Sequence, residues 1–260
     1  MNLKARWAAG ETTFGVWGTI DSSFTAELIC SEGPDFFCCD QQHGVVDYQT
    51  MVSIFQGVRA SGSIPVSRVP NHDLMLIGKT LDAGALGVIV PMVSTPAEAE
   101  ALVSAFHYQP AGVRSYGPVR AGMVLGSTQP AGLTADVACI LMIETASALE
   151  SVDAIAATPG VDALYIGPAD LSLSLGLPPT FDQQVPEYQD AIAAVVAACE
   201  RHGIVAGIQC TNGDMAARYA AMGFRFVTVA SDANTLRSAV RGQLDAARGV
   251  ERTAVTGGYA

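Results

Sequence analysis

Lysine is scarce in this sequence, which has only Lys4 and Lys79 among its 260 residues. Lys4 precedes the first predicted strand, and Lys79 lies in a predicted helix. A Schiff-base enzyme built on a β/α barrel needs a lysine at the end of a strand, in surroundings that keep its amine neutral. Neither lysine meets that requirement, so the sequence argues against imine chemistry.

Long apolar runs and basic clusters are also missing. No uninterrupted apolar stretch approaches the roughly 20 residues of a membrane-spanning helix, and the N-terminus lacks the apolar segment of a signal peptide. The formal net charge is −11, and the 14 lysine and arginine residues are spread along the chain. Because nucleic acids and anionic membranes bind clustered cations, neither is expected as a partner. We therefore expect a cytoplasmic protein.

Cysteine and histidine patterns typical of metal sites are missing too. The six cysteines show no CxxC or Cys/His spacing and lie mostly in apolar runs, as reduced core thiols do. The four histidines are scattered among different predicted elements, which disfavours zinc. Three of them are expected to be structural, His72 and His107 on helices and His202 at a helix end.

Eight short apolar runs alternate with alanine-rich helical segments such as 95–106, 186–203 and 232–249. The runs are residues 15–19, 36–40, 65–69, 87–91, 140–144, 163–167, 205–209 and 226–230. Eight such units in about 250 residues are typical of an α/β fold, the single (β/α)8 TIM barrel. An open, doubly wound sheet is the main alternative, but no GxGxxG or GxxxxGK[ST] motif follows the first strand. We expect one domain over residues 1–250 and a flexible tail over residues 251–260.

The longest stretch without a clear pattern covers residues 108–136, between the fourth helix and the fifth strand. In a barrel this connection lies on the N-terminal side of the strands, unless it folds back over the site or a neighbour. We expect it to be irregular.

Two of the apolar runs lead into carboxylates. ACILMIE ends at Glu144, and DALYIGPAD, one helix later, ends at Asp170. Because the C-terminal ends of parallel strands meet at one rim of a barrel, we expect the two acids to lie close together. Such oxygen ligands suit Mg²⁺ or Mn²⁺, with water and substrate oxygens completing the shell. The alternative is that each acid only caps the helix that follows it.

Other polar residues are expected at the same rim. His43 follows Asp40 by three residues, an arrangement that suits proton transfer but also occurs in loops without a catalytic role. Arg68 ends a strand, where its guanidinium suits a substrate carboxylate, an enolate or a buried ion pair. Gln209 ends the seventh strand, and Asp82 most simply ends a helix.

Several stretches resemble the metal-dependent, pyruvate-using class II aldolases of the HpcH/HpaI type, which act on 4-hydroxy-2-oxoheptanedioate and similar 2-keto acids. The matching segments are FFCCDQQHG (36–44), PVSRVP (65–70), LDAGALGVIVPMV (81–93), GVRSYGPVRA (112–121), MIET (142–145) and YIGPADLSLSLG (165–176). The resemblance spans nearly the whole chain, and IGPADLS at this distance from a strand-end glutamate is specific. It implies a TIM barrel of the phosphoenolpyruvate/pyruvate-binding type. It also implies reversible cleavage of a 4-hydroxy-2-keto acid to pyruvate, or hydroxypyruvate, and an aldehyde through a metal-stabilised enolate.

The resemblance also implies roles for single residues. Glu144 and Asp170 would bind Mg²⁺, Mn²⁺ or Co²⁺, and Arg68 would stabilise the enolate oxygen. His43, supported by Asp40, would be the acid/base that works through water.

Further implied contacts concern the substrate and a neighbouring subunit. The substrate-binding segment would be Gly167, Pro168, Ala169 and Asp170, with the N–H groups of Ala169 and Asp170 holding the pyruvate carboxylate. Members of the family are homo-hexamers, trimers of dimers, in which Asp82 would reach the rim of a neighbouring subunit's site.

Two residues depart from the family pattern. Met142 stands where relatives often carry a glutamine, which removes a polar contact near the metal ligands. Gln209 stands where we expect an apolar side chain lining the substrate pocket. A glutamine there suits a hydrogen bond to a hydroxyl group, and hence hydroxypyruvate as donor.

Two other functions compete with aldol cleavage. An acyl-CoA carbon–carbon lyase of the citryl- or malyl-CoA type shares the two-carboxylate site but needs cations for the CoA phosphates. The 12 arginines and two lysines form no obvious basic groove. A catalytically silent barrel that binds keto acids predicts pyruvate binding without turnover.

Overall fold

The eight apolar runs form eight strands, each within two residues of its expected bounds. They are β1 (Thr13–Gly18), β2 (Phe36–Asp40), β3 (Ile64–Arg68), β4 (Gly87–Val90), β5 (Ala138–Ile143), β6 (Ala163–Ile166), β7 (Val205–Ile208) and β8 (Phe226–Ser231). Neighbouring strands pair in parallel, and β8 pairs with β1, so the sheet closes into a barrel. The closed sheet confirms the TIM barrel and rules out the doubly wound alternative. This computed structural model describes residues 2–250, so the tail expected over residues 251–260 lies outside the described residues.

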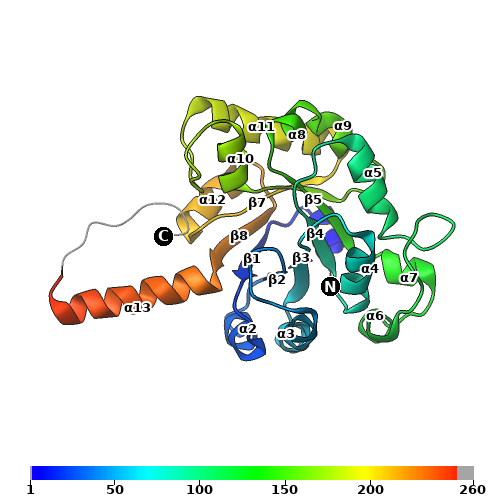
Figure 1. Ribbon diagram of the computed structural model, residues 1–260, viewed down its shortest axis with the longest axis horizontal. Helices are drawn as coiled ribbons and strands as arrows, with labels where there is room; N and C mark the ends of the chain where they lie inside the picture. The colour runs from blue at the N-terminus through cyan, green and yellow to red at the C-terminus, as the bar shows by residue number, and fades with distance from the viewer. Residues whose placement is uncertain (1, 251–260) are drawn as a thin grey trace.

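Helices surround the barrel and connect its strands (Figure 1). They are α1 (Leu3–Ala8), α2 (Ser23–Cys30), α3 (Tyr48–Ala60), α4 (Leu74–Asp82), α5 (Pro96–Ser104), α6 (Val119–Leu125), α7 (Pro130–Thr134), α8 (Ala146–Glu150), α9 (Val152–Ala156), α10 (Pro168–Ser174), α11 (Pro186–His202), α12 (Gly213–Ala221) and α13 (Asp232–Arg248). Thr95 and Glu98 begin α5 with a reciprocal capping box. Within residues 2–250, no helix is both long and apolar enough to cross a membrane.

The connection over residues 108–136 is not irregular throughout, because it contains α6 and α7. Gly126, in a left-handed conformation with φ of 64°, ends α6, and Pro130 begins α7. The two helices have seven and five residues. Segments of that length are too short to show helical periodicity, which explains why the pattern of the sequence does not reveal them.

Alternation along the strands places their apolar side chains in two clusters of the core. Residues facing the barrel axis, among them Trp17 and Tyr165, form one cluster, and residues facing the helices form the other. Cys38 belongs to the first and Cys39 to the second, as expected of consecutive strand residues. All six cysteines are buried free thiols, which confirms their expected place in the core.

One end of the barrel is closed by α1. Leu3 and Trp7 of this helix belong to the cluster that fills the barrel. The Trp7 ring lies 5.4 Å from that of Phe226, and its Nε1 donates a 3.1 Å hydrogen bond to Thr13 Oγ1. Because α1 precedes β1, it covers the N-terminal ends of the strands and leaves their C-terminal ends as the open mouth.

The last helix, α13, extends away from the barrel (Figure 1). Of its residues only Asp232, in the first turn, is buried. Leu236, Val240 and Leu244 follow one another at one-turn intervals and are 57, 50 and 45% exposed. We call these three residues the α13 stripe. Such a row of apolar side chains on one helix face is typical of a surface that packs against another element.

Candidate active site

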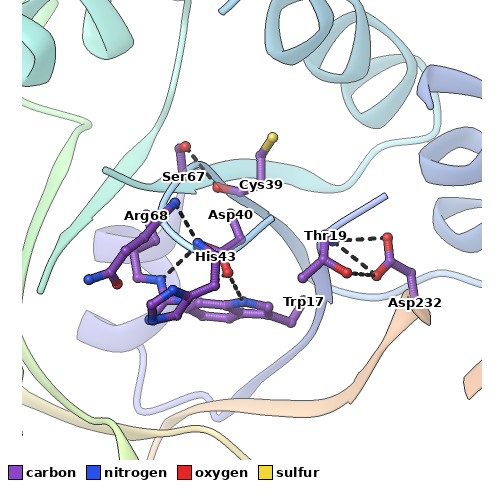
Figure 2. A network of polar contacts seen from close by, with 9 residues as sticks. Trp17, Thr19, Cys39, Asp40, His43, Ser67, Arg68 and Asp232 are labelled. Atoms are coloured by element: carbon purple, nitrogen blue, oxygen red, sulfur yellow. Dashed lines mark hydrogen bonds and ion pairs between the residues drawn. The ribbon is translucent and has the colours of Figure 1, made fainter. Parts of the chain in front are cut away.

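Asp40 and Arg68 form a buried ion pair at the mouth of the barrel (Figure 2). They end β2 and β3 and are direct partners in the strand register. Arg68 donates from Nε to Asp40 Oδ1 at 2.9 Å and from Nη2 to Oδ2 at 2.6 Å, a bidentate geometry. Trp17 Nε1 donates to the same Oδ2 at 3.0 Å, and the guanidinium lies 4.9 Å from the centre of the Trp17 ring. Arg68 is therefore held rigidly, with its charge at the mouth.

The two charges stabilise each other. Burial raises the pKa of Asp40, but the hydrogen bonds and charge of Arg68 outweigh burial and bring that pKa below its ordinary value. Burial lowers the pKa of Arg68, and Asp40 outweighs this effect in the opposite direction. Both groups therefore stay ionised at neutral pH.

His43 lies in the loop that follows β2 and is exposed. Asp40 holds this loop through its Oδ1, which accepts hydrogen bonds from the backbone N–H groups of Gln42 at 3.0 Å and His43 at 3.4 Å. The expected support of His43 by Asp40 thus acts on the backbone of His43. The imidazole itself lines the cavity at the barrel mouth together with Trp17.

Glu144 is 2% exposed and directly follows β5. Its Oε2 accepts a 2.8 Å hydrogen bond from the backbone N–H of Met92. Gly167 leaves the space for this carboxylate, because a Cβ atom there would lie 2.2 Å from Glu144 Oε1. Burial raises the pKa of Glu144 to about 7, while Met92 N–H and Arg68 oppose the shift and Asp170 adds to it. Glu144 is not a helix cap, since Thr145 caps α8.

Asp170 lies in the first turn of α10 and is half-buried. No side chain caps α10, and Gly167 occupies its N-cap position. Glu144 Oε1 lies against Gly167, the residue that precedes this helix, so the two acids lie close together, as their positions after neighbouring strands predict. Among residues 2–250, no three His, Cys, Asp or Glu side chains gather as a metal cluster. The protein thus offers a pair of carboxylates, which fits an ion that keeps several water ligands.

Met142 lies two residues before Glu144 on β5 and is fully buried among the side chains that fill the barrel. Residues two apart in a strand point to the same side. Met142 therefore lies below Glu144 on the barrel axis and provides an apolar floor.

Asp82 is not brought to the mouth of its own barrel. It ends α4, as expected, and its carboxylate accepts a 2.7 Å hydrogen bond from Nη2 of Arg114. Helices of a TIM barrel run antiparallel to the strands they cover, so α4 ends toward the side closed by α1. Within one chain, Asp82 is thus separated from Asp40 and Glu144.

Gln209 directly follows β7 and is 8% exposed. Its backbone N–H donates to Ile166 O at 3.3 Å, and its side chain lines the same cavity as His43. The cavity has a volume of about 210 Å³. It lies at the ends of β1, β2, β7 and β8, beside the carboxylate pair at the ends of β5 and β6.

Several residues of the site are not evident from the sequence. In the sequence, Trp17 is indistinguishable from the other apolar residues of its strand. Met92 is the only residue other than glycine with positive φ in residues 2–250. His72, expected on a helix, lies in the turn before α4, where its Nε2 is 2.7 Å from the carbonyl oxygen of Pro91. Asp232 accepts hydrogen bonds from the backbone of Thr19 and fixes the loop after β1 (Figure 2).

A sequence profile of the HpcH/HpaI aldolase/citrate lyase family matches residues 13–239. That range contains every strand of the barrel and all the residues of the site described above.

Individual relatives match over almost their full length. A hydroxypyruvate/pyruvate aldolase from Rhizorhabdus wittichii is 37% identical over 239 residues, covering 92% of this chain and 95% of the relative. A 2-dehydro-3,6-dideoxy-6-sulfogluconate aldolase from Pseudomonas putida is 34% identical over 237 residues, covering 90% and 92%. The crystal structure of an HpcH/HpaI aldolase/citrate lyase family protein from Burkholderia cenocepacia superposes with a TM-score of 0.84. It is 32% identical and covers 95% of this chain and 98% of that one.

Proposed function

Because this chain belongs to the HpcH/HpaI aldolase/citrate lyase family, we propose that it is a metal-dependent aldolase that cleaves a 4-hydroxy-2-keto acid to pyruvate, or hydroxypyruvate, and an aldehyde. The class of enzyme, a carbon–carbon lyase and aldolase, follows from its relatives. The aldolase names of these relatives favour aldol cleavage over the acyl-CoA lyase alternative. The observation that carries the proposal is that Glu144 lies against Gly167 in the segment that holds Asp170, at the same rim as the ion pair of Asp40 and Arg68.

Glu144 and Asp170 would hold a divalent ion, Mg²⁺, Mn²⁺ or Co²⁺. Gly167 lets the Glu144 carboxylate lie against the start of α10, whose first turn holds Asp170, and a pair of neighbouring carboxylates fits such an ion. Two neighbouring carboxylates repel each other unless a cation lies between them. A divalent ion bound there would withdraw electron density from the oxygens of the keto acid.

The chain's own residues would bind the substrate and move its protons. The N–H groups of Ala169 and Asp170, in the segment that also contains Gly167 and Pro168, would hold the carboxylate of the keto acid. In cleavage, His43 would take the proton of the C4 hydroxyl group through a water molecule, and the C3–C4 bond would break. The electron pair would pass to the C2 oxygen as an enolate, which the fixed guanidinium of Arg68 would stabilise. Protonation at C3 would then give pyruvate.

Gln209 would select the donor. Its side chain lines the cavity beside His43, and a glutamine amide suits a hydrogen bond to the C3 hydroxyl of hydroxypyruvate. Donor kinetics of Gln209→Leu test this assignment. A selective loss with hydroxypyruvate is expected, and an equal loss with both donors would reject it.

The active form would be a homo-hexamer, a trimer of dimers, in which Asp82 reaches the site of a neighbouring subunit. The position of Asp82 away from its own barrel mouth and the exposed α13 stripe support such an assembly. We also propose a cytoplasmic location, in keeping with six buried cysteines that are all free thiols.

A direct assay tests this function. Metal-stripped protein is supplied with Mg²⁺, Mn²⁺ or Co²⁺ and incubated with pyruvate or hydroxypyruvate and a panel of aldehydes. We expect a 4-hydroxy-2-keto acid to form only with metal, and Glu144→Ala to be inactive. Full activity without metal, or in that variant, would reject the proposal.

A further inference from the structure

The cavity beside the carboxylate pair is lined in part by two polar residues that the mechanism does not use, Asn234 and Arg237. It is about 210 Å³ in volume, smaller than the roughly 300–1,000 Å³ pockets that hold drug-sized ligands. Its wall combines His43 and Gln209 with Asn234 and Arg237 from the first turns of α13. A molecule of a few carbons with hydrogen-bonding groups matches these dimensions and this lining.

Two of these side chains lack a partner in the described part of the chain. Gln209 is 8% exposed, and its amide group makes no hydrogen bond to residues 2–250. The oxygen and nitrogen of this amide are not fully buried, so they are accessible to a ligand in the cavity. Arg237, which is exposed, forms no ion pair with an acid in the same range of residues.

The acids near the cavity already have partners (Figure 2). Both carboxylate oxygens of Asp40 accept hydrogen bonds from Arg68. Asp232 accepts hydrogen bonds from Thr19 N, Thr19 Oγ1 and Ile20 N. The guanidinium of Arg237 is therefore the charge on the cavity wall that has no counter-charge among residues 2–250. It favours an anionic group at this place.

His43 relates the cavity to the reaction. The carbonyl oxygen of the aldehyde becomes the C4 hydroxyl group, so it must lie within reach of the group that moves this proton, and His43 lines the cavity. The keto acid would occupy the side of the mouth formed by β5 and β6. The rest of the aldehyde then extends toward β7, β8 and α13, where Asn234 and Arg237 lie.

We propose that this cavity is the subsite for the tail of the aldehyde, and that Arg237 selects aldehydes that end in a carboxylate or a phosphate group. The proposal rests on the proposed aldolase function. Asn234, half-buried beside Arg237, adds an amide that suits a hydroxyl group on the same tail.

The test compares aldehydes that differ in their terminal group. Pyruvate and metal are kept saturating while kcat/KM is measured for succinic semialdehyde, glyceraldehyde 3-phosphate and the neutral glyceraldehyde. Arg237→Ala is expected to lower the ratio of kcat/KM for anionic to neutral aldehyde about tenfold, as loss of one charge-assisted hydrogen bond would. Arg237→Glu should lower it further. The aldehyde with the larger loss identifies the preferred anion.

Arg241→Ala is the matched control, because Arg241 lies one turn further along α13 and does not line the cavity. It changes the net charge equally and should leave the ratio unchanged. An unchanged ratio in Arg237→Ala, or an equal fall in Arg241→Ala, would overturn the proposal. Failure of the proposed function is distinguishable, because the wild-type protein would then form no product with any of the three aldehydes.

Discussion

The backbone N–H of Met92 donates a 2.8 Å hydrogen bond to Glu144 Oε2 from a left-handed conformation with φ of 58°. A residue other than glycine adopts this backbone conformation at a cost of about 1 kcal/mol or more. His72 stabilises the turn, since its Nε2 lies 2.7 Å from the carbonyl oxygen of the preceding Pro91. The loop after β4 is thus shaped to orient the carboxylate that follows β5.

His72→Ala is therefore expected to weaken metal binding although His72 is no ligand. Loss of a hydrogen bond that orients a ligand typically lowers metal affinity about 10- to 100-fold. Calorimetric titration of the metal-free protein with Mn²⁺ measures the change. His72→Asn, which keeps an N–H donor, should recover part of the affinity. Equal Mn²⁺ affinity in wild type and His72→Ala would show that the turn does not depend on this contact.

Gly167→Ala should displace Glu144. The new Cβ atom would lie 2.2 Å from Glu144 Oε1, closer than Cβ atoms approach other atoms in proteins, so the carboxylate must move. We expect Mn²⁺ affinity to fall about 10- to 100-fold. The matched control is Gly57→Ala in α3, where the Cβ atom has room and its nearest neighbour is 3.5 Å away. That change should leave Mn²⁺ affinity intact and raise stability by up to about 1 kcal/mol. A similar loss of affinity in both variants would contradict the assigned role of Gly167.

Asp40→Asn should destabilise the fold in a pH-dependent way. It leaves the charge of Arg68 buried without its partner, at a cost of about 3–5 kcal/mol near pH 7. Because the pKa of Asp40 is lowered in the folded state, its contribution is complete above the unfolded pKa of about 3.9. It is lost as the pH falls through the folded pKa. Urea unfolding at pH 7, 5, 4 and 3 measures the free energy of unfolding of both proteins. The difference between wild type and variant should shrink only at the lowest pH values, whereas a constant difference would argue against the ion pair.

Val240→Asp should disrupt the proposed assembly. It places a charge in the middle of the α13 stripe, which a subunit interface would bury at considerable cost. Light scattering after size-exclusion chromatography is expected to give a hexamer for wild type and smaller species for the variant. Ser238→Asp adds the same charge on the opposite face of α13 and should remain hexameric. A monomeric mass for the wild-type protein would contradict the proposed hexamer.

The barrel could be predicted from the sequence because its strands are buried on both faces and therefore read as continuous apolar runs. The rim positions of Glu144 and Asp170 followed from the same reasoning, since Glu144 ends one such run and Asp170 lies in the turn of helix that follows the next. The short helices α6 and α7 were not evident, because seven and five residues do not establish a helical period.

Local pairing at the rim was harder to predict. From the sequence, the Arg68 side chain could form either a buried ion pair or a substrate contact. Only the register of β2 and β3 places it against Asp40. Nothing in the residue type of Met92 indicates a left-handed backbone. The roles of Trp17 and Asp232 depend on neighbours that are distant in sequence, so local patterns carry no signal for them.

Exchange of the methyl protons of pyruvate with deuterated solvent measures metal-dependent enolate formation directly, before the natural aldehyde is known. The exchange is followed by proton NMR in the absence of aldehyde, with metal-stripped protein, with added Mg²⁺, and with Glu144→Ala in Mg²⁺. We predict rapid exchange only for the wild-type protein with Mg²⁺. Exchange at the same rate without metal, or in Glu144→Ala, would contradict it.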